Sequence, residues 1–293
     1  MEISHEVPLS MLEMSRWFND YDYALVHLFD SYPDYFDFYK KSIEMGRTVI
    51  LDNSLYELGS AFDMAEYASW INRLNPTYYI LPDTFWNTDA TMNQAMEWMY
   101  KYGNNIGSAK RIGVAQGDSL GAIIRCYKFM STFCDRIAFT FKFAPGVIND
   151  PAFEKFIHDT FLQSELDTWT DADKQAVCRY WLLMTLERFG IVDKTKEYHL
   201  LGLQNTKGLS AIAHDFPWIT SIDTSNPIIT GYLGKKYNPF GNAGTSKPET
   251  KLESIFEDSF DDHDISNIKY NVRVFRNIVD PIVLEDDIKI ENK

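Results

Sequence analysis

Short apolar runs alternate with helical patterns along most of this sequence, and this alternation restricts the possible folds more than any other feature. Each run is bounded by polar residues or glycine, which is typical of strands in a parallel sheet covered on both faces. Strands that alternate with helices predict an α/β architecture. The runs predicted as strands are Tyr23–Phe29, Thr48–Asp52, Thr77–Leu81, Arg111–Gln116, Arg136–Phe141, Tyr198–Leu203 and Trp218–Asp223.

Helical periodicity fills the intervals between these strands. One predicted helix has Asn87 as a capping candidate, and its apolar residues recur at i, i+3, i+4 and i+7, namely Met92, Ala95, Met96 and Met99. A longer helical pattern covers residues 171–189. Stripes of this kind are typical of helix faces that pack on a core, and we interpret them so rather than as cofactor sites.

A doubly wound sheet and a (β/α)8 barrel both satisfy the alternation. The number of strand–helix units and the length of 293 residues favour the barrel, as a single domain over residues 1–293. No eighth strand is visible in the sequence, so one strand is expected to be irregular or missing. Residues 264–280 predict an additional C-terminal helix.

The alternation stops after Asp223. Residues 224–250 are rich in Gly, Asn, Pro, Thr and Lys, which predicts a long loop, and loops of this length are more often functional than idle. Residues 281–293 predict an acidic tail.

Charge and cysteine content exclude several classes of protein. With 28 Lys and Arg against 42 Asp and Glu, the net charge is −14, which argues against non-specific coating of nucleic acid. The three cysteines suit neither a disulfide framework nor a zinc site. No apolar run is long enough to span a membrane, and the first residues lack the pattern of a signal peptide. We therefore expect a soluble protein in the cytoplasm.

Polar side chains stand at the ends of four predicted strands. Asp52 and Asp223 end two of them, and Asp83 and Gln116 follow two others. In a barrel the carboxyl ends of the strands form one mouth, so these groups are expected to converge on one pocket. Crowded carboxylates separate in pKa, which suits one as nucleophile and another as acid or base. Each aspartate alone has an alternative as a helix cap or turn former.

Other catalytic signatures are weak. His27, His199 and His214 lack partners at ligand spacing, so we interpret them as packed or surface histidines and expect no metal. The glycines around Gln116 form no phosphate-binding motif, and a serine nucleophile elbow is absent. No cofactor is expected.

The ordered strand ends resemble those of the tRNA-guanine transglycosylases and their phage relatives that insert 7-deazaguanines into DNA. ILDNSLYELG resembles the segment with the general base and a stacking aromatic, which implies these roles for Asp52 and Tyr56, with Asn53 among the base-binding residues. LPDTF is similar to the segment that binds the guanine edge, here through Asp83. GVAQGD is similar to the segment whose glutamine binds the base, here Gln116.

The resemblance continues in the second half of the chain and covers roughly residues 20–280. HLLGLQN resembles the strand with a glycine ahead of the nucleophile segment, here Gly202, and TSIDTSNPI resembles that segment, which implies Asp223 as the nucleophile. Phe141 stands where the family has a glycine-rich strand end that contacts the base through its backbone.

Two departures from the family favour its DNA-modifying branch. The tRNA enzymes carry a Cys3His zinc subdomain after the nucleophile strand, whereas no cysteine follows Cys178 here. The chain is also shorter than the bacterial tRNA enzymes. The resemblance thus implies replacement of guanine in DNA by a 7-deazaguanine (preQ0-like) base, through a covalent bond between Asp223 and the sugar. DNA, single-stranded or with a flipped base, and the free base are the expected partners. The likeness to the phage enzymes also implies the host cytoplasm as the location if a phage encodes the chain.

A protein with this net charge needs a local basic surface to bind DNA. The candidates in the loop after Asp223 are Lys235, Lys236 and Lys247. The candidates on the last helix, spaced i, i+4 and i+7, are Lys269, Arg273 and Arg276. A cationic stripe on a helix is also typical of a merely solvated face.

Other functions stay open. One is a transglycosylase or glycosidase that acts on tRNA, on a free nucleoside or on another modified base. Another is an inactive barrel that serves as a nucleic-acid-binding subunit. The sequence leaves the incoming base and the oligomeric state open, with a homodimer as one option.

Overall fold

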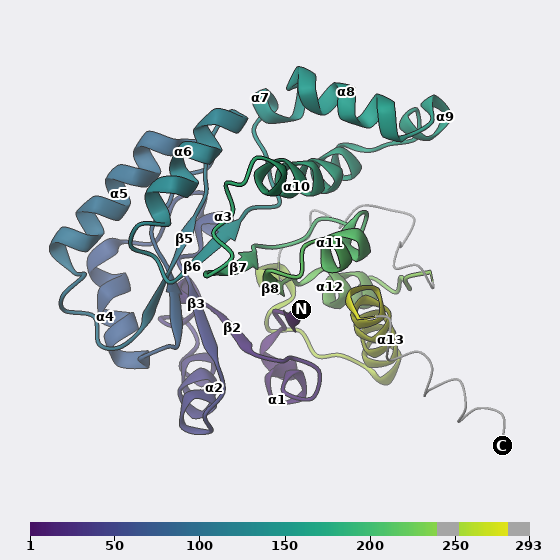
Figure 1. The fold of residues 1–293 in the computed structure, drawn as a ribbon. Helices are drawn as coiled ribbons and strands as arrows, with labels where there is room; N and C mark the ends of the chain where they lie inside the picture. Colours follow the sequence, from purple (N-terminus) through teal and green to yellow (C-terminus); the bar gives the residue numbers. More distant parts are fainter. Residues whose placement is uncertain (239–251, 281–293) are drawn as a thin grey trace.

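The computed structural model describes residues 1–238 and 252–280, which form a (β/α)8 barrel followed by a C-terminal helix (Figure 1). The strands lie in the order β1-β8-β7-β6-β5-β4-β3-β2, and all neighbouring pairs are parallel. All seven strands expected from the sequence are present. The strands are β1 (Glu2–Ser4), β2 (Asp22–Leu25), β3 (Val49–Asp52), β4 (Tyr78–Ile80), β5 (Lys110–Val114), β6 (Arg136–Phe139), β7 (Glu197–Leu200) and β8 (Ile219–Asp223).

The eighth strand is β1, at the very start of the chain. Its three residues are too few to produce an apolar run, which is why the sequence did not reveal it. β1 pairs with β8 but forms no ladder with β2 among the described residues. Asn19 and Asp20 close this gap: the Asp20 N–H donates to the Ile3 carbonyl (2.9 Å), and the Asn19 side chain binds both backbone groups of His5 (2.8 and 2.9 Å).

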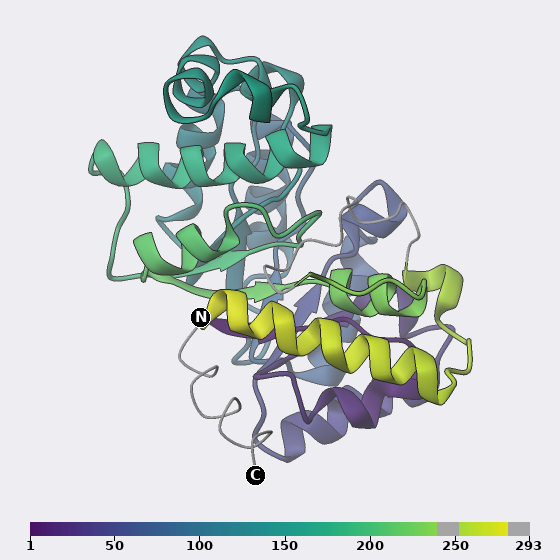
Figure 2. The same cartoon turned by 90° about the vertical axis from the view of Figure 1, so that its right-hand side faces the viewer.

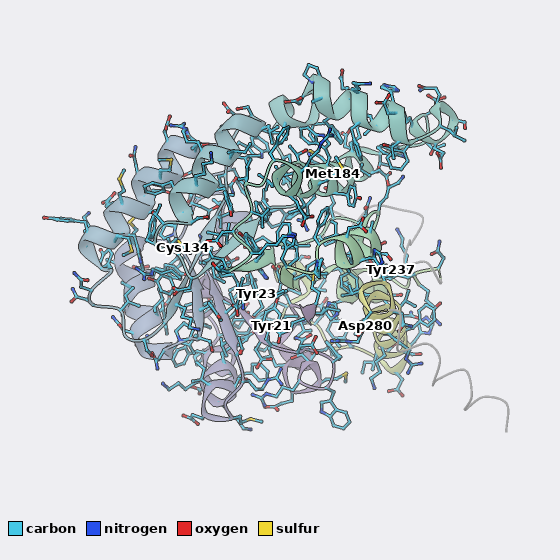
Figure 3. All side chains as sticks on the ribbon, viewed as in Figure 1. Tyr21, Tyr23, Cys134, Met184, Tyr237 and Asp280 are labelled. Carbon is cyan, nitrogen blue, oxygen red and sulfur yellow. The ribbon has the colours of Figure 1, made fainter. Side chains whose placement is uncertain are left out.

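Helices surround the barrel, and side chains fill the space between them and the sheet (Figure 3). None of the helices in the described ranges is both long enough and apolar enough to cross a membrane. The α-helices are α1 (Leu12–Ser15), α2 (Pro33–Glu44), α3 (Leu55–Leu58), α4 (Met64–Leu74), α5 (Thr88–Lys101), α6 (Leu120–Met130), α7 (Pro145–Ile148), α8 (Pro151–Thr160), α9 (Gln163–Leu166), α10 (Asp171–Arg188), α11 (Leu209–Asp215), α12 (Asn226–Tyr232) and α13 (Asp262–Val279). The short 3-10 helices are η1 (Leu9–Met11), η2 (Val26–Leu28) and η3 (Leu252–Ile255).

The helices expected from the sequence are present with the expected caps. The Asn87 side chain accepts a hydrogen bond from the Ala90 N–H at the start of α5, and α10 and α13 match the two longer patterns. One detail differs: Met96 was expected on the core face of α5 but is half exposed.

Two boundaries also differ from the sequence-based expectation. The first predicted strand stops at Leu25, because the chain turns there into η2. The predicted loop 224–250 begins with helix α12, in which Pro227 occupies the first turn and the following isoleucines are buried. Residues 239–251, with Lys247, and the predicted tail 281–293 lie outside the described residues.

Two groups of helices extend the barrel. α13 packs along α12 on the side of β8 (Figure 2). α7 and α8 follow β6 and pack on α10, and with α9 they form an outer layer (Figure 1). The insertion that carries α7–α9 leaves the barrel next to Phe141, at the carboxyl end of the sheet.

Candidate active site

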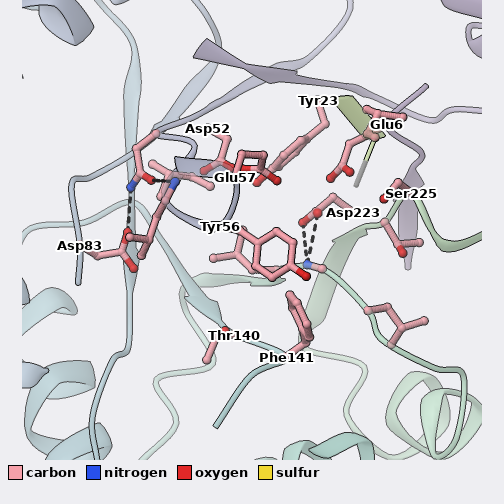
Figure 4. A pocket seen from close by; sticks show the side chains of 18 of the residues that line it. Glu6, Tyr23, Asp52, Tyr56, Glu57, Asp83, Thr140, Phe141, Asp223 and Ser225 are labelled. Atoms are coloured by element: carbon pink, nitrogen blue, oxygen red, sulfur yellow. Dashed lines mark hydrogen bonds between the residues drawn. The ribbon is translucent and has the colours of Figure 1, made fainter. Parts of the chain in front are cut away.

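One pocket lies at the carboxyl ends of the strands, and it brings together every residue that the sequence predicted for catalysis or base binding (Figure 4). β3 and β8 end at Asp52 and Asp223, so the barrel itself aims both carboxyl groups at the mouth. Their convergence is therefore confirmed, whereas the chemical role of each residue stays a prediction. The predicted residues that line the pocket are Asp52, Asn53, Tyr56, Asp83, Gln116, Phe141, Gly202 and Asp223.

Asp83 is held by two amide donors. Its Oδ1 accepts from Asn53 Nδ2 and its Oδ2 accepts from Gln116 Nε2, both at 2.8 Å. Asn53 also donates to the Leu81 carbonyl, and the Trp86 N–H donates to Gln116 Oε1, so the two amides are fixed in orientation. Burial raises the pKa of Asp83 to about 6, although both hydrogen bonds lower it. The result is an oriented carboxylate whose remaining lone pairs are suited to accept N–H groups.

Asp223 is buried and is surrounded by donors. Its Oδ1 lies 2.8 Å from His199 Nε2, and the Gly202 N–H lies 3.2 Å from both of its oxygens. Burial raises the pKa of Asp223 to about 6, while hydrogen bonds with the Glu6 side chain and Gly202 lower it. A carboxyl with this pKa is mostly ionised at neutral pH, as a nucleophile must be.

Asp52 lies in a different environment. No hydrogen bond reaches its side chain from any residue within 1–238 or 252–280. Burial, then the negative charges of Glu57 and Asp223, raise its pKa well above the usual range. The surroundings of Asp52 thus favour its protonated form, whereas Asp223 accepts hydrogen bonds that favour its ionised form, and this contrast suits an acid beside a nucleophile.

Glu6 and Glu57 also line the pocket, and the sequence analysis missed both. Glu6 follows β1, the strand that the sequence did not reveal, and its carboxyl lies beside that of Asp223 (Figure 4). Glu57 lies in α3, next to Tyr56. Once β1 is known, Glu6 is identified as a polar residue just after the carboxyl end of a strand, like Asp83 and Gln116. No sequence pattern identifies Glu57.

An aromatic pair forms another wall of the pocket. The rings of Tyr56 and Phe141 meet edge to face with centroids 5.4 Å apart, and Tyr56 is 38% exposed. Gly202 lies against the Phe141 ring with φ +60°, and a Cβ there would come within 2.6 Å of that ring. Glycine is thus required at position 202 by both conformation and space.

Gly202→Ala should lower the free energy of unfolding by about 1–3 kcal/mol, because the added methyl group meets the Phe141 ring in a strained backbone conformation. Gly121→Ala is the matched control, since Gly121 lies in helix α6 with open space around its Cα. Urea unfolding of the parent and both variants measures the difference. Equal stability of the parent and Gly202→Ala would contradict the expectation.

Arg179 supports the same wall from behind, and no sequence signal pointed to it. It comes from α10, is buried, and donates to the carbonyls of Thr140, Leu201 and Gly202 at 2.9–3.2 Å. Burial lowers the pKa of Arg179 to about 9, whereas the Asp223 charge raises it. Arg179 thereby joins the ends of β6 and β7 and places a positive charge near Asp223.

The cations proposed from the sequence lie away from this pocket as far as the structure describes them. Of the described residues that line it, none is Lys or Arg. Lys235 and Lys236 follow the end of α12, and Lys236 lies over the Tyr270 ring (5.5 Å). Arg276 pairs with Asp20 (3.0 Å) and donates to the Phe18 carbonyl, so it ties α13 to the barrel. The other two α13 cations, Lys269 and Arg273, are exposed.

A different cation stands closer to the mouth. Lys142 follows β6, and its Nζ lies 5.9 Å from the Phe85 ring centroid and 5.8 Å from that of Trp86. Phe85 itself lines the pocket. The Lys142 carbonyl accepts from Trp86 Nε1 (3.1 Å), which fixes this strand end against the loop after β4.

The histidines are placed as the sequence predicted, with one important addition. His27 contacts Ser54 (2.8 Å), and His214 is exposed beside Asp215. His199 is packed inside the barrel, but its hydrogen bond to Asp223 was not foreseen. Within the described ranges no three His, Cys, Asp or Glu side chains are grouped so that they could hold a metal ion.

Comparisons with known proteins assign no family. No protein-family model and no curated protein matches the sequence. Among solved structures, the chain is similar to N-succinyl Arg/Lys racemase from Bacillus cereus, with 12% identity and a TM-score of 0.38 over 78% of this chain. The match spans about half of the racemase chain (52%), and a TM-score this low carries no functional argument.

Proposed function

We propose that this chain is a base-exchange transglycosylase that replaces guanine in DNA with a 7-deazaguanine base. The observation that carries the proposal is the single pocket that holds Asp52, Asp83, Gln116 and Asp223. These residues were chosen from the sequence for four separate strand ends, and a base exchange needs all four functions in one place. The resemblance to the guanine transglycosylases gave the assignment of their roles.

The nucleophile in this proposal is Asp223. Its carboxylate attacks C1′ of the target nucleotide, a sugar–oxygen bond forms, and the bond from C1′ to guanine breaks through an oxocarbenium-like state. The covalent intermediate keeps the strand on the enzyme while guanine leaves and the new base enters. The donors His199 and Gly202 hold the carboxylate in place before the attack.

Asp52 moves the proton in both halves of the reaction. Its raised pKa keeps a proton available for the imidazole ring of the departing guanine. The resulting carboxylate then takes the proton from the five-membered-ring nitrogen of the incoming base, which attacks C1′ and releases Asp223. Asp52 ends the cycle as it began, so no other proton donor is required.

Base recognition falls to the Asp83 network and the aromatic wall. The Asp83 carboxylate accepts the N–H groups of a guanine edge, and Gln116 faces the same side of the pocket through its bond to Asp83. Tyr56 and Phe141 offer apolar ring surface to a flat heterocycle. A 7-deazaguanine keeps the guanine edge, so one site suits both the leaving and the incoming base.

We expect covalent adduct formation to increase as the pH rises through about 6. The pKa of Asp223 is about 6, so below this pH the carboxyl is protonated and cannot attack. The adduct between protein and labelled DNA, measured on denaturing gels from about pH 4.5 to pH 8, should show this acid limb. A rate that stays constant down to pH 4.5 would contradict Asp223 as the ionised nucleophile.

DNA binding is expected to depend more on Lys142 than on the cations proposed from the sequence. Lys142→Glu should weaken binding of single-stranded DNA and lower the salt slope by about 1, because Lys142 lies over Phe85 at the edge of the pocket. The Lys235→Glu, Lys236→Glu double variant tests the surface after α12, and Lys128→Glu on the exposed side of α6 is the control. Fluorescence anisotropy at several salt concentrations measures the affinities. If only the double variant loses affinity, the strand lies over the region after α12.

A second function is favoured by one observation: of the described residues that line the pocket, none carries a positive charge. A free nucleoside lacks phosphates and avoids repulsion by the carboxylates, so the same residues suit base exchange or hydrolysis of a nucleoside. Mass spectrometry of nucleosides from DNA, RNA and the free pool separates the two functions. The experiment uses cells that express the protein with a 7-deazaguanine supply. A DNA transglycosylase should produce modified DNA, whereas a nucleoside enzyme should change only the free pool.

A further inference from the structure

A line of buried polar side chains runs through the barrel below Asp223. Arg136 Nη1 lies 3.1 Å from Ser221 Oγ, Ser221 Oγ lies 2.9 Å from His199 Nδ1, and His199 Nε2 lies 2.8 Å from Asp223 Oδ1. All four side chains are at least 94% buried. They come from the neighbouring strands β6, β7 and β8, where His199 and Ser221 are register partners.

The charged groups at the two ends of the line set the direction of its bonds, because a guanidinium only donates and an ionised carboxylate only accepts. A guanidinium only donates, so Ser221 Oγ accepts from Arg136. The serine hydroxyl hydrogen is then available for His199 Nδ1, which accepts it. Burial, and then the Arg136 charge, lower the pKa of His199 well below its usual value, so the ring is neutral and has one proton. That proton is on Nε2, opposite the Asp223 carboxylate.

We propose that Arg136, Ser221 and His199 form a one-way chain of hydrogen-bond donors that holds His199 as its Nε2–H tautomer and orients the Asp223 carboxylate. The role in orienting a nucleophile rests on the proposed function, whereas the tautomer and the donor direction do not. His199 and Ser221 are positioning residues, because they act through Asp223 and line no part of the pocket.

Aromatic packing prevents the ring from escaping this arrangement. The Tyr23 ring is stacked on His199 at 6.0 Å between centroids, and the Tyr21 ring meets it edge on at 6.4 Å. A flip of the imidazole would place carbon atoms opposite Ser221 and Asp223 and break both bonds. The charged and titratable groups around His199 are thus Asp223, Arg136, Tyr21 and Tyr23, with Arg179 acting over a longer distance.

Nitrogen NMR tests the tautomer without any substrate. The chain has six histidines, and the spectrum of His199→Gln identifies the signals of His199 in protein labelled with ¹⁵N-histidine. We expect a protonated Nε2 and an unprotonated Nδ1 between about pH 7 and pH 8, where Asp223 is ionised. A protonated Nδ1 anywhere in this range would overturn the proposal.

Kinetics test the effect on the nucleophile. His199→Phe keeps an aromatic ring but removes the donor, so adduct formation should slow by roughly 10- to 100-fold, and its acid limb should move to higher pH. KM for the free base should stay unchanged, because the Asp83 network is intact. His199→Gln, which retains an N–H donor, should recover part of the rate, and Ser221→Ala should move the limb in the same direction as His199→Phe.

His5 provides the matched control. It is also a buried histidine, but it bonds the Thr224 carbonyl and does not contact Asp223. His5→Phe should leave the acid limb where it is. If His199→Phe lowers only the yield of folded protein and leaves the limb in place, His199 is structural and the proposal is wrong.

The donor chain can also be tested if the proposed function is wrong. If the parent protein exchanges no base in DNA, RNA or nucleosides, the pKa of Asp223 is followed by carboxyl ¹³C NMR instead. The donor chain then predicts a higher pKa for Asp223 in His199→Phe than in the parent, and an unchanged pKa rejects it.

Discussion

Asp223→Asn should abolish both base exchange and covalent trapping, with a loss of about 10³-fold or more, and should leave the barrel folded. The amide has the shape of the carboxylate but lacks the charge and the basic oxygen that attack C1′. His199 Nε2 still finds an acceptor in the amide oxygen, so the buried donor keeps a partner. Removal of a buried charge whose pKa is raised also takes away a cost of folding at neutral pH.

Incorporation of labelled 7-deazaguanine into DNA measures this loss, and a denaturing gel detects the adduct. Asp118→Asn is the matched control, because it makes the same chemical change at an exposed position in the loop after β5, outside the pocket. Parental incorporation by Asp223→Asn would reject the covalent mechanism and favour the alternatives of a different nucleophile or a non-catalytic barrel.

Asp52→Asn should reduce turnover by about 10²-fold or more, yet the adduct should still form when the departing base is a good leaving group. The nucleophile is intact in this variant, whereas the proton donor for ordinary guanine is lost. The two variants should therefore fail at different steps. Asp223→Asn should form no adduct, whereas Asp52→Asn should form the adduct but exchange the base slowly. Loss of the adduct with every leaving group in Asp52→Asn would show that Asp52 has another role.

Asp52→Asn should also stabilise the protein increasingly as the pH rises. The pKa of Asp52 is raised in the folded state, so its contribution to stability is present at acid pH and is lost as the pH rises through that folded pKa. Above it, the ionised group faces Glu57 and Asp223, and the amide removes this repulsion. Urea unfolding at pH 5 and pH 8 should show a larger gain at pH 8. An equal gain in the free energy of unfolding at pH 5 and pH 8 would mean that ionisation of Asp52 does not destabilise the folded state.

Most of the barrel was predictable because buried parallel strands leave continuous apolar runs in the sequence. The runs that end in β3 and β8 also located Asp52 and Asp223, since the polar residue at the end of each run marks the carboxyl end of its strand. β1 escaped this reasoning because three residues give no periodicity. Because β1 was not predicted, Glu6, which follows it, was not identified as a pocket residue either.

Helix α12 was missed for a different reason. Its composition is that of a loop, and its buried packing against α13 stabilises the helical conformation. Tertiary packing overrides weak local preference in such segments. The same limit applies to the surface cations: the sequence showed a stripe on the last helix, but Arg276 is used in an internal ion pair with Asp20, more than 250 positions away along the chain.

The sequence by itself determined seven of the eight strands and located Asp52, Asp83 and Asp223 at strand ends, because apolar runs and the alternation of side chains along a strand are local properties of the chain. Only the tertiary structure decided what each carboxylate can do. Burial raises the pKa of both groups, but hydrogen bonds with the Glu6 side chain and the Gly202 N–H lower that of Asp223, whereas the charges of Glu57 and Asp223 raise that of Asp52 further. Desolvation and charge pairing depend on neighbours distant in sequence, so two aspartates that look the same in the sequence have different electrostatic surroundings in the fold.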